Sequence, residues 1–273
     1  MYYHVLNQAM TVTEEALIID SVFLKREVTC SLLVPDVFNE LNKINLLLLN
    51  DGQESDNLQL KTTLENLYDN QQIGPTIVAA IHAGERIQEY GVAGTPDFKG
   101  RGSKAAAYTS FITQELVPKL QELIGMKTFG TIAFAGFSLG GLSALDIVLN
   151  NPQLFDKVGA FSGSFWWRSK DLNEGYNAEQ DRIAHRIVRQ KEHQPGLKFW
   201  FQTGTKDEAS DRNGNGIIDS MDDTVDLIKT LETKGYSRPA DIGYVEIING
   251  QHNVETWAKA MPKFLRWAFG QSL

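Results

Sequence analysis

A serine flanked by glycines is the clearest chemical signal in the sequence. Residues 131–142, TIAFAGFSLGGL, form an apolar run that ends around Ser138, and a helix-like stretch follows at 143–149. A strand, a sharp turn and a helix hold such a serine in a strained conformation with its hydroxyl exposed, and the glycines avoid clashes with neighbouring backbone. Ser138 is therefore predicted to be a nucleophile. The alternative is a glycine-rich connection or a phosphate cradle, but no phosphate-binding glycine motif accompanies it.

A serine hydroxyl needs a base, usually an imidazole that a carboxylate orients. His252 follows a predicted strand near the end of the chain, and Asp207 and Glu208 follow another predicted strand. We favour Asp207 as the acid because it is shorter and comes first, with Glu208 as the substitute. The order Ser138, Asp207, His252 is that of α/β-hydrolases.

Backbone N–H groups are expected to stabilise the negative charge of a tetrahedral intermediate. One donor should be the N–H of Leu139, directly after the nucleophile. The second should come from the turn 50–53, Asn-Asp-Gly-Gln, which ends a predicted strand. We expect the N–H of Gln53 to be this donor, and an ordinary turn is the alternative.

Strands alternating with helices are predicted to position these residues. Buried strands are expected at 44–49, 76–81, 131–137, 158–162, 197–202 and 242–248, with edge strands within 22–34, and helices at 104–123, 143–149, 178–190, 223–234 and from about 254, where Pro262 should bend or break the last one. This alternation predicts a mostly parallel central sheet with helices on both faces. Active sites in such sheets form beyond the carboxyl ends of the strands, where the candidate residues lie.

Length and composition favour one α/β domain over residues 1–273, with a small helical cap insertion at about 165–196. The net charge of −8 argues against nucleic acid as a partner. No apolar run is long enough for a membrane span and no signal peptide is apparent, so we expect a cytoplasmic protein unless a leader was removed. The single cysteine, Cys30, is expected in the core. The oligomeric state stays open.

A second motif, at 211–222, is typical of a calcium loop. Hard Ca²⁺ prefers six to eight oxygen ligands, and alternate side chains around a glycine turn aim oxygens at one point. The expected ligands are Asp211, Asn213, Asn215, the carbonyl of Ile217, Asp219 and Asp222. Asp222 replaces the usual Glu at position 12, and an Asn/Gly/Asp-rich surface turn is the alternative. We expect any bound Ca²⁺ to be structural and to order the loop that carries Asp207.

Several motifs together resemble the Putative esterase family, which includes enterochelin esterases, esterase D and feruloyl esterases. The resemblance covers nearly everything from about residue 20 onward, and Ser-Gly-Ser-Phe-Trp-Trp at 162–167 is most like the enterochelin-esterase branch. Two features depart from that branch: its iron-siderophore enzymes often carry an extra N-terminal domain, which we do not expect here, and the 211–222 loop is not a general family feature. The motifs are Asp51-Gly-Gln53, Arg86 with Glu89-Tyr90, Gly100-Arg-Gly-Ser-Lys104, Tyr108, Glu115-Leu-Val-Pro118, Gly136 to Gly141, 162–167 and His252.

The resemblance and the residues together imply a serine carboxylester hydrolase with an α/β-hydrolase fold and an acyl-enzyme intermediate. Its expected substrate is a small siderophore-like, aromatic or short-chain acyl ester, with no organic cofactor. Trp166 and Trp167 could stack on an aromatic group, and Arg86 could meet an anionic one, although a core or surface position is the alternative for each. An acyltransferase on the same scaffold, or a non-catalytic ligand-binding homologue, is the alternative function.

Overall fold

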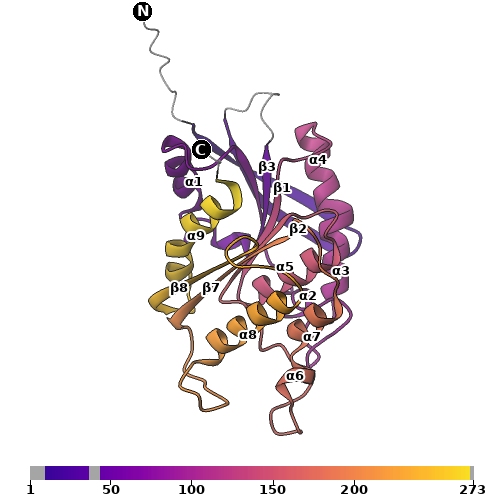
Figure 1. Ribbon diagram of the computed structural model, residues 1–273. Coiled ribbons are helices and arrows are strands. Elements are labelled where there is room, and N and C mark those ends of the chain that lie inside the picture. Colours follow the sequence, from indigo (N-terminus) through magenta and orange to yellow (C-terminus); the bar gives the residue numbers. More distant parts are fainter. Residues whose placement is uncertain (1–9, 37–43, 271–273) are drawn as a thin grey trace, which may run out of the picture.

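The computed structural model describes residues 10–36 and 44–270, and these residues form one eight-stranded sheet with helices on both faces (Figure 1). The strand order is β1-β2-β4-β3-β5-β6-β7-β8. The first two strands run antiparallel to their neighbours, and the other six are parallel, as predicted. The strands are β1 Val12–Ser21, β2 Arg26–Pro35, β3 Asn45–Asn50, β4 Thr76–Ile81, β5 Ile132–Phe137, β6 Lys157–Phe161, β7 Lys198–Lys206 and β8 Ile242–Gln251.

Two helices cover one face of the sheet and a larger group covers the other (Figure 1). The first face carries α1 Leu60–Asp69 and α9 Val254–Phe269, and the second carries α3 Ala105–Ser110, η2 Phe111–Leu116, α4 Val117–Ile124, α5 Leu139–Asn150, α7 Ile183–Gln190 and α8 Asp219–Thr233. Side chains alternate between the two cores along a strand: in β3, Leu46 and Leu48 join one cluster while Leu47 and Leu49 join the other. This two-sided burial explains why the central strands are continuously apolar.

The amino-terminal edge differs from the prediction. Edge strands were expected within 22–34, whereas β1 begins at Val12 and residues 22–25 form the turn into β2. Within the described residues β1 pairs only with β2, and Glu14 and Glu15 are exposed on it. Because an edge strand has one hydrogen-bonded neighbour and faces solvent, its sequence lacks the apolar run by which a buried strand is recognised.

Two predicted helices also differ in detail. α9 continues through Pro262, so the expected break does not occur. The predicted helix 178–190 is divided into α6 Ala178–Asp181 and α7, because Arg182 between them has an extended backbone (φ −72°, ψ 108°). α7 packs against α8 and α5, which places the helical part of the insertion among the helices that flank the sheet.

Candidate active site

The turn between β5 and α5 has the strained geometry expected of a nucleophile. Ser138 has φ 53° and ψ −118°, a combination that non-glycine residues rarely adopt. A Cβ at Gly136 would lie 2.5 Å from the backbone of Gly140, and a Cβ at Gly140 would lie 3.0 Å from the side chains of Asn50 and Asp51. Glycine at position 136 therefore lets the backbone close this turn, and glycine at position 140 leaves room for the side chains packed against it.

The three residues predicted for catalysis follow parallel strands at the same edge of the sheet. Ser138 comes directly after β5, Asp207 directly after β7 and His252 directly after β8. Asp207 is 9% exposed, and its Oδ2 accepts the N–H of Gly204 at 2.9 Å. Its buried Oδ1 has no hydrogen-bond partner among the described residues, which leaves that oxygen available to an imidazole N–H.

The charges of Asp207 and His252 influence each other. Burial raises the pKa of Asp207, while the Gly204 N–H, the Ser162 hydroxyl and the nearby His252 lower it. The pKa of His252 is lowered by the protein around its ring, raised by the Asp207 carboxylate and lowered by Arg86. A neutral imidazole at neutral pH is the form that a general base requires. The two side chains therefore interact electrostatically, and their roles as acid and base stay a prediction.

Glu208, the substitute acid, is directed elsewhere. Burial raises the pKa of Glu208, the backbone of Ser220 lowers it, and the nearby carboxylates of Asp219 and Asp223 raise it. All three residues belong to α8, so the Glu208 carboxylate lies near that helix. The geometry therefore favours Asp207 as the partner of His252.

The turn after β3 is held against the nucleophile turn by buried polar contacts. Asn50 donates to the carbonyl of Gly140 at 2.8 Å, and the N–H of Asp51, in a left-handed conformation (φ 61°, ψ 44°), donates to the Tyr90 hydroxyl at 3.1 Å. Gln53 follows in the short helix η1 Gly52–Glu54. Across the described chain, the N–H groups of Gln53 and Leu139 donate to no acceptor outside their own helices. They are the donors predicted for an oxyanion.

Arg86, predicted to contact substrate, is engaged inside the protein. Its guanidinium, in the short helix α2 Arg86–Glu89, pairs with both carboxylate oxygens of Asp51 at 2.7 and 3.0 Å. It also donates to the carbonyl of Phe137 at 3.3 Å and lies over the Tyr90 ring at 5.2 Å. These contacts join the turn after β3 to the residue before the nucleophile. Arg86 therefore has a positioning role here, which does not fit the predicted substrate contact.

The two tryptophans predicted to contact substrate occupy different environments. Trp167 is fully buried and its indole N–H points to the carbonyl of Thr95 at 3.4 Å, so neither face of its ring is open to a ligand. Its predicted stacking role is therefore wrong for this conformation, because the ring belongs to the core. Trp166 is half-buried, with the Arg101 guanidinium 5.0 Å from its ring.

Two serines after β6 were not recognised as site residues from the sequence. Ser162 is buried, has a positive φ of 46°, and accepts the indole N–H of Trp257 at 3.1 Å. The Oγ of Ser164, also buried, lies 3.3 Å from the Oγ of Ser138. The available signal was the Ser-Gly-Ser segment directly after a predicted strand, at the edge of the sheet where Ser138 also lies.

The residues predicted to bind calcium are only partly arranged for it. Oxygens of Asp211, Asn213 and Asn215 turn inward and accept N–H groups of residues 215–217 at 2.8 to 3.1 Å. Asp219, however, lies 3.6 Å from the Arg212 guanidinium, and Asp222 accepts the amide of Asn213 at 2.7 Å. In residues 10–36 and 44–270 no three carboxylate, histidine or cysteine side chains are placed to hold a metal ion.

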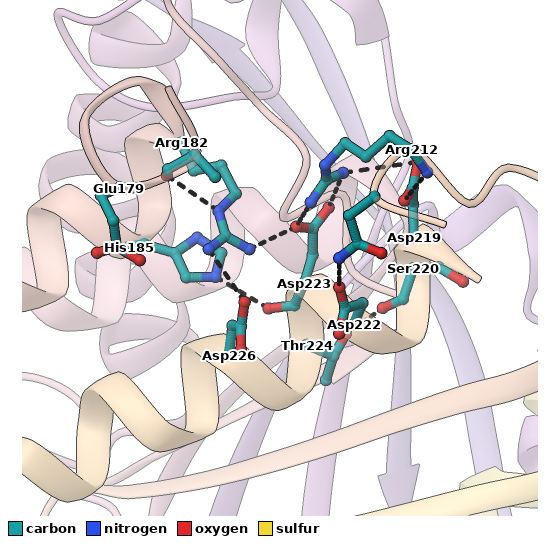
Figure 2. A network of polar contacts seen from close by, with 12 residues as sticks. Glu179, Arg182, His185, Arg212, Asp219, Ser220, Asp222, Asp223, Thr224 and Asp226 are labelled. Carbon is teal, nitrogen blue, oxygen red and sulfur yellow. Dashed lines mark hydrogen bonds and ion pairs between the residues drawn. The ribbon is translucent and has the colours of Figure 1, made fainter. Parts of the chain in front are cut away.

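A buried ionic network connects this loop to the insertion (Figure 2). Asp223 in α8 lies between two guanidinium groups, pairing with Arg182 at 2.7 Å and with Arg212 at 2.9 Å, while Arg182 also reaches Asp226 at 3.1 Å. The fully buried His185 bonds to the carbonyl of Asp223 at 2.9 Å. Pairing of buried charges in this way offsets their desolvation. The network explains why Arg182 leaves the helical path between α6 and α7.

The sheet, its order and the strained serine turn define an α/β-hydrolase fold. The sequence model described as Putative esterase matches residues 21–268, and the chain belongs to this family. Two curated Bacillus subtilis (strain 168) proteins are similar: the uncharacterized protein YbbA, 29% identical over 39% of this chain and 44% of its own length, and the uncharacterized protein YjcH, 24% identical over 77% of this chain and 80% of its own length. The YbbA match thus spans less than half of that protein.

Solved structures share this fold at low sequence identity. The enterochelin esterase from Shigella flexneri is 19% identical with a TM-score of 0.69, and the match covers 96% of this chain and 59% of that one. The siderophore hydrolase EstB from Aspergillus nidulans is 17% identical with a TM-score of 0.68, covering 98% and 100%. An IroE-like serine hydrolase from Shewanella oneidensis is 18% identical with a TM-score of 0.70, covering 94% and 80%. In the described part of this chain, no helix combines the length and apolarity needed to span a bilayer.

Proposed function

We propose that this protein is a serine carboxylester hydrolase that uses Ser138, His252 and Asp207. The observation that carries the proposal is the strained backbone of Ser138 at the sheet edge where Asp207 and His252 shift each other's pKa. Membership of the Putative esterase family supports the same reaction class.

In the proposed reaction, His252 takes the proton of the Ser138 hydroxyl as its Oγ attacks the ester carbonyl carbon. The N–H groups of Leu139 and Gln53 stabilise the resulting oxyanion, and Asp207 stabilises the imidazolium. The alcohol leaves with the proton from His252, which forms the acyl-enzyme. A water molecule then gives its proton to His252 and attacks the acyl carbon. Collapse of this second intermediate returns the proton to Ser138 Oγ and releases the acid.

The proposed substrate is a small siderophore-like, aromatic or short-chain acyl ester. Among the similar structures, one is named an enterochelin esterase, another a siderophore hydrolase and a third a ferulic acid esterase. An open hollow of about 430 Å³ lies beside His252, where a leaving alcohol would take up its proton; it is lined by Asn57, His252, Asn253, Val254, Glu255 and Trp257. The half-buried Trp166 is the remaining candidate for stacking on an aromatic group.

Labelling and turnover together test the proposal. A fluorophosphonate probe should label the wild type, and Ser138→Ala should abolish both labelling and p-nitrophenyl ester hydrolysis. A panel of acetyl, feruloyl and trilactone esters would identify the acyl group. Added alcohol would reveal an acyltransferase by formation of a new ester, and a protein that binds ligands without labelling would be a non-catalytic homologue. Either outcome replaces the hydrolase proposal.

We also propose that residues 211–222 bind Ca²⁺ in a structural role, with the ligands expected from the sequence. The inward-turned oxygens of Asp211, Asn213 and Asn215 support this. Binding would require Asp219 to leave Arg212, so Ca²⁺ and the guanidinium should compete for that carboxylate. Calorimetry should find a lower melting temperature after chelation, restored by Ca²⁺ in the wild type and not in Asp211→Ala. An unchanged melting curve without bound metal would end the proposal.

A further inference from the structure

The hydroxyl of Ser164 is the hydrogen-bond partner of the nucleophile in this structure. Its Oγ lies 3.3 Å from Ser138 Oγ, and its backbone N–H donates to the carbonyl of Ser138 at 3.0 Å. Two separate contacts therefore tie Ser164 to the nucleophile turn. The Ser164 side chain is buried, with an exposed fraction of 3% for the residue.

The backbone around Ser164 fixes the position of this hydroxyl. The N–H of Ser162, which has a positive φ of 46°, donates to the carbonyl of Gln202 at 2.7 Å. A Cβ at Gly163 would lie 2.5 Å from the ring of Phe165, so only glycine fits between the two serines. The carbonyl of Ser164 accepts the N–H of Trp167 at 3.2 Å. Both backbone polar groups of Ser164 are thus satisfied without its side chain.

The Ser164 hydroxyl therefore has no structural bond to maintain other than the one to Ser138. Ser138 Oγ is the only side-chain or backbone group in residues 10–36 and 44–270 with which this hydroxyl forms a hydrogen bond. Buried hydroxyls normally satisfy a backbone or structural side-chain group. A buried hydroxyl bonded only to the reacting oxygen has the placement of a catalytic group.

We propose that Ser164 is a catalytic residue that donates a hydrogen bond to Ser138 Oγ when this oxygen becomes the leaving group. This inference rests on the proposed hydrolase function. During deacylation the bond between the acyl carbon and Oγ breaks, negative charge develops on Oγ, and His252 delivers the proton that water gave up. A fixed donor stabilises that charge before the proton arrives.

The donor acts mainly on deacylation because the two ground states differ. In the free enzyme Ser138 Oγ is a hydroxyl oxygen that already shares a hydrogen bond with the Ser164 hydroxyl, so the transition state of acylation gains little from it. In the acyl-enzyme Oγ is an ester oxygen, which accepts hydrogen bonds weakly, and the bond strengthens as charge develops. Only interactions stronger in the transition state than in the ground state accelerate a step.

Pre-steady-state hydrolysis of a p-nitrophenyl ester tests the proposal. For Ser164→Ala we expect the burst of p-nitrophenol to keep its amplitude and its rate within about threefold, while the steady-state rate falls about tenfold to a hundredfold, the range for loss of one hydrogen bond. Mass spectrometry should then find accumulated acyl-enzyme. Ser164→Thr, which retains a hydroxyl, should recover part of the deacylation rate. Rates are counted per site labelled by fluorophosphonate, so a poorly folded fraction does not affect them.

Ser21→Ala is the matched control, because this distant serine is also buried and its hydroxyl bonds to Glu115 at 2.6 Å. It should alter stability without changing the ratio of the two rates. Equal loss of acylation and deacylation in Ser164→Ala, or no loss of either, would overturn the role of Ser164. Absence of labelling and of a burst in the wild type would instead overturn the hydrolase proposal itself.

Discussion

The ring of Trp257 packs edge-on against the imidazole of His252, with the ring centroids 5.3 Å apart and the planes at 81°. The same indole donates its N–H to Ser162 Oγ at 3.1 Å, and the Ser162 hydroxyl lowers the pKa of Asp207. One residue of α9 therefore touches the predicted base and the serine beside the predicted acid. This arrangement couples the orientation of the imidazole to the position of the carboxylate.

Replacing Trp257 tests this coupling. Trp257→Phe keeps an aromatic ring but removes the hydrogen bond to Ser162, so we expect kcat/KM to fall about threefold to thirtyfold, the range for loss of a neutral hydrogen bond with partial repacking. Trp267→Phe, in the same helix but packed on Phe264, is the control and should leave kcat/KM unchanged. Ester hydrolysis kinetics and melting temperatures of both variants provide the measurement. Equal activity of the two variants would contradict the coupling.

The acid can be assigned by comparing Asp207→Asn with Glu208→Gln. Asp207→Asn removes the carboxylate whose charge raises the pKa of His252, and we expect kcat to fall by about 10³ to 10⁴, as when the acid of a serine triad is replaced by its amide. Glu208→Gln should change kcat by less than about threefold, because the Glu208 carboxylate lies near Ser220 in α8. Steady-state kinetics at pH 8 measure both. The reverse pattern would assign the role to Glu208.

The pH dependence of kcat/KM should report the lowered pKa of His252. The base must be neutral, so activity rises with pH as the imidazolium loses its proton. The protein around the ring and the charge of Arg86 lower this pKa below the usual 6.5, while Asp207 opposes the shift. The midpoint of the acidic limb should therefore lie below pH 6.5. A midpoint at pH 7 or higher would mean that a different group is titrating.

His185 should make the fold sensitive to acid. Burial and, to a smaller extent, the charge of Arg182 lower its pKa to about 3. Between pH 6.5 and 3 the unfolded chain binds a proton that the folded chain excludes, so stability is lost as pH falls through this range. When the pH is lowered from 7.5 to 5, the unfolding free energy of the wild type should fall by about 2 kcal/mol more than that of His185→Gln. Urea titrations measure this, with His193→Gln, at an exposed histidine, as the control.

Asp223 should be the most costly member of the ionic network to lose. Asp223→Asn leaves Arg182, 3% exposed at its side chain, and Arg212 without their shared carboxylate. We expect a loss of about 3 to 5 kcal/mol in unfolding free energy, typical of a buried charge left without its partner. Asp226→Asn, at a partner of Arg182 that is 33% exposed, should cost no more than about 1 kcal/mol. Similar losses of unfolding free energy for Asp223→Asn and Asp226→Asn in urea titrations would show that burial of the carboxylate does not determine the cost of removing it.

The central strands and the nucleophile turn could be predicted because their signals are local. β4 was predicted at its observed bounds, Thr76–Ile81, since burial on both faces makes the strand continuously apolar. The backbone around Ser138 requires glycines two residues before and after it, so the turn can be recognised from residues 136–140 alone. The exposed edge strand β1 gave no such signal, and the extended backbone at Arg182 depends on partners about 40 residues later in α8.

The sequence by itself determined the α/β class, the nucleophile candidate and the order of the three catalytic candidates, because strand burial and turn geometry are encoded by neighbouring residues. Only the tertiary structure decided that Arg86 pairs with Asp51, that Trp167 is buried, and that Ser164 lies beside Ser138 Oγ. These depend on which side chains meet across the edge of the sheet. Parallel strands bring distant loops together there, and residue spacing along the chain carries no record of which atoms then come into contact.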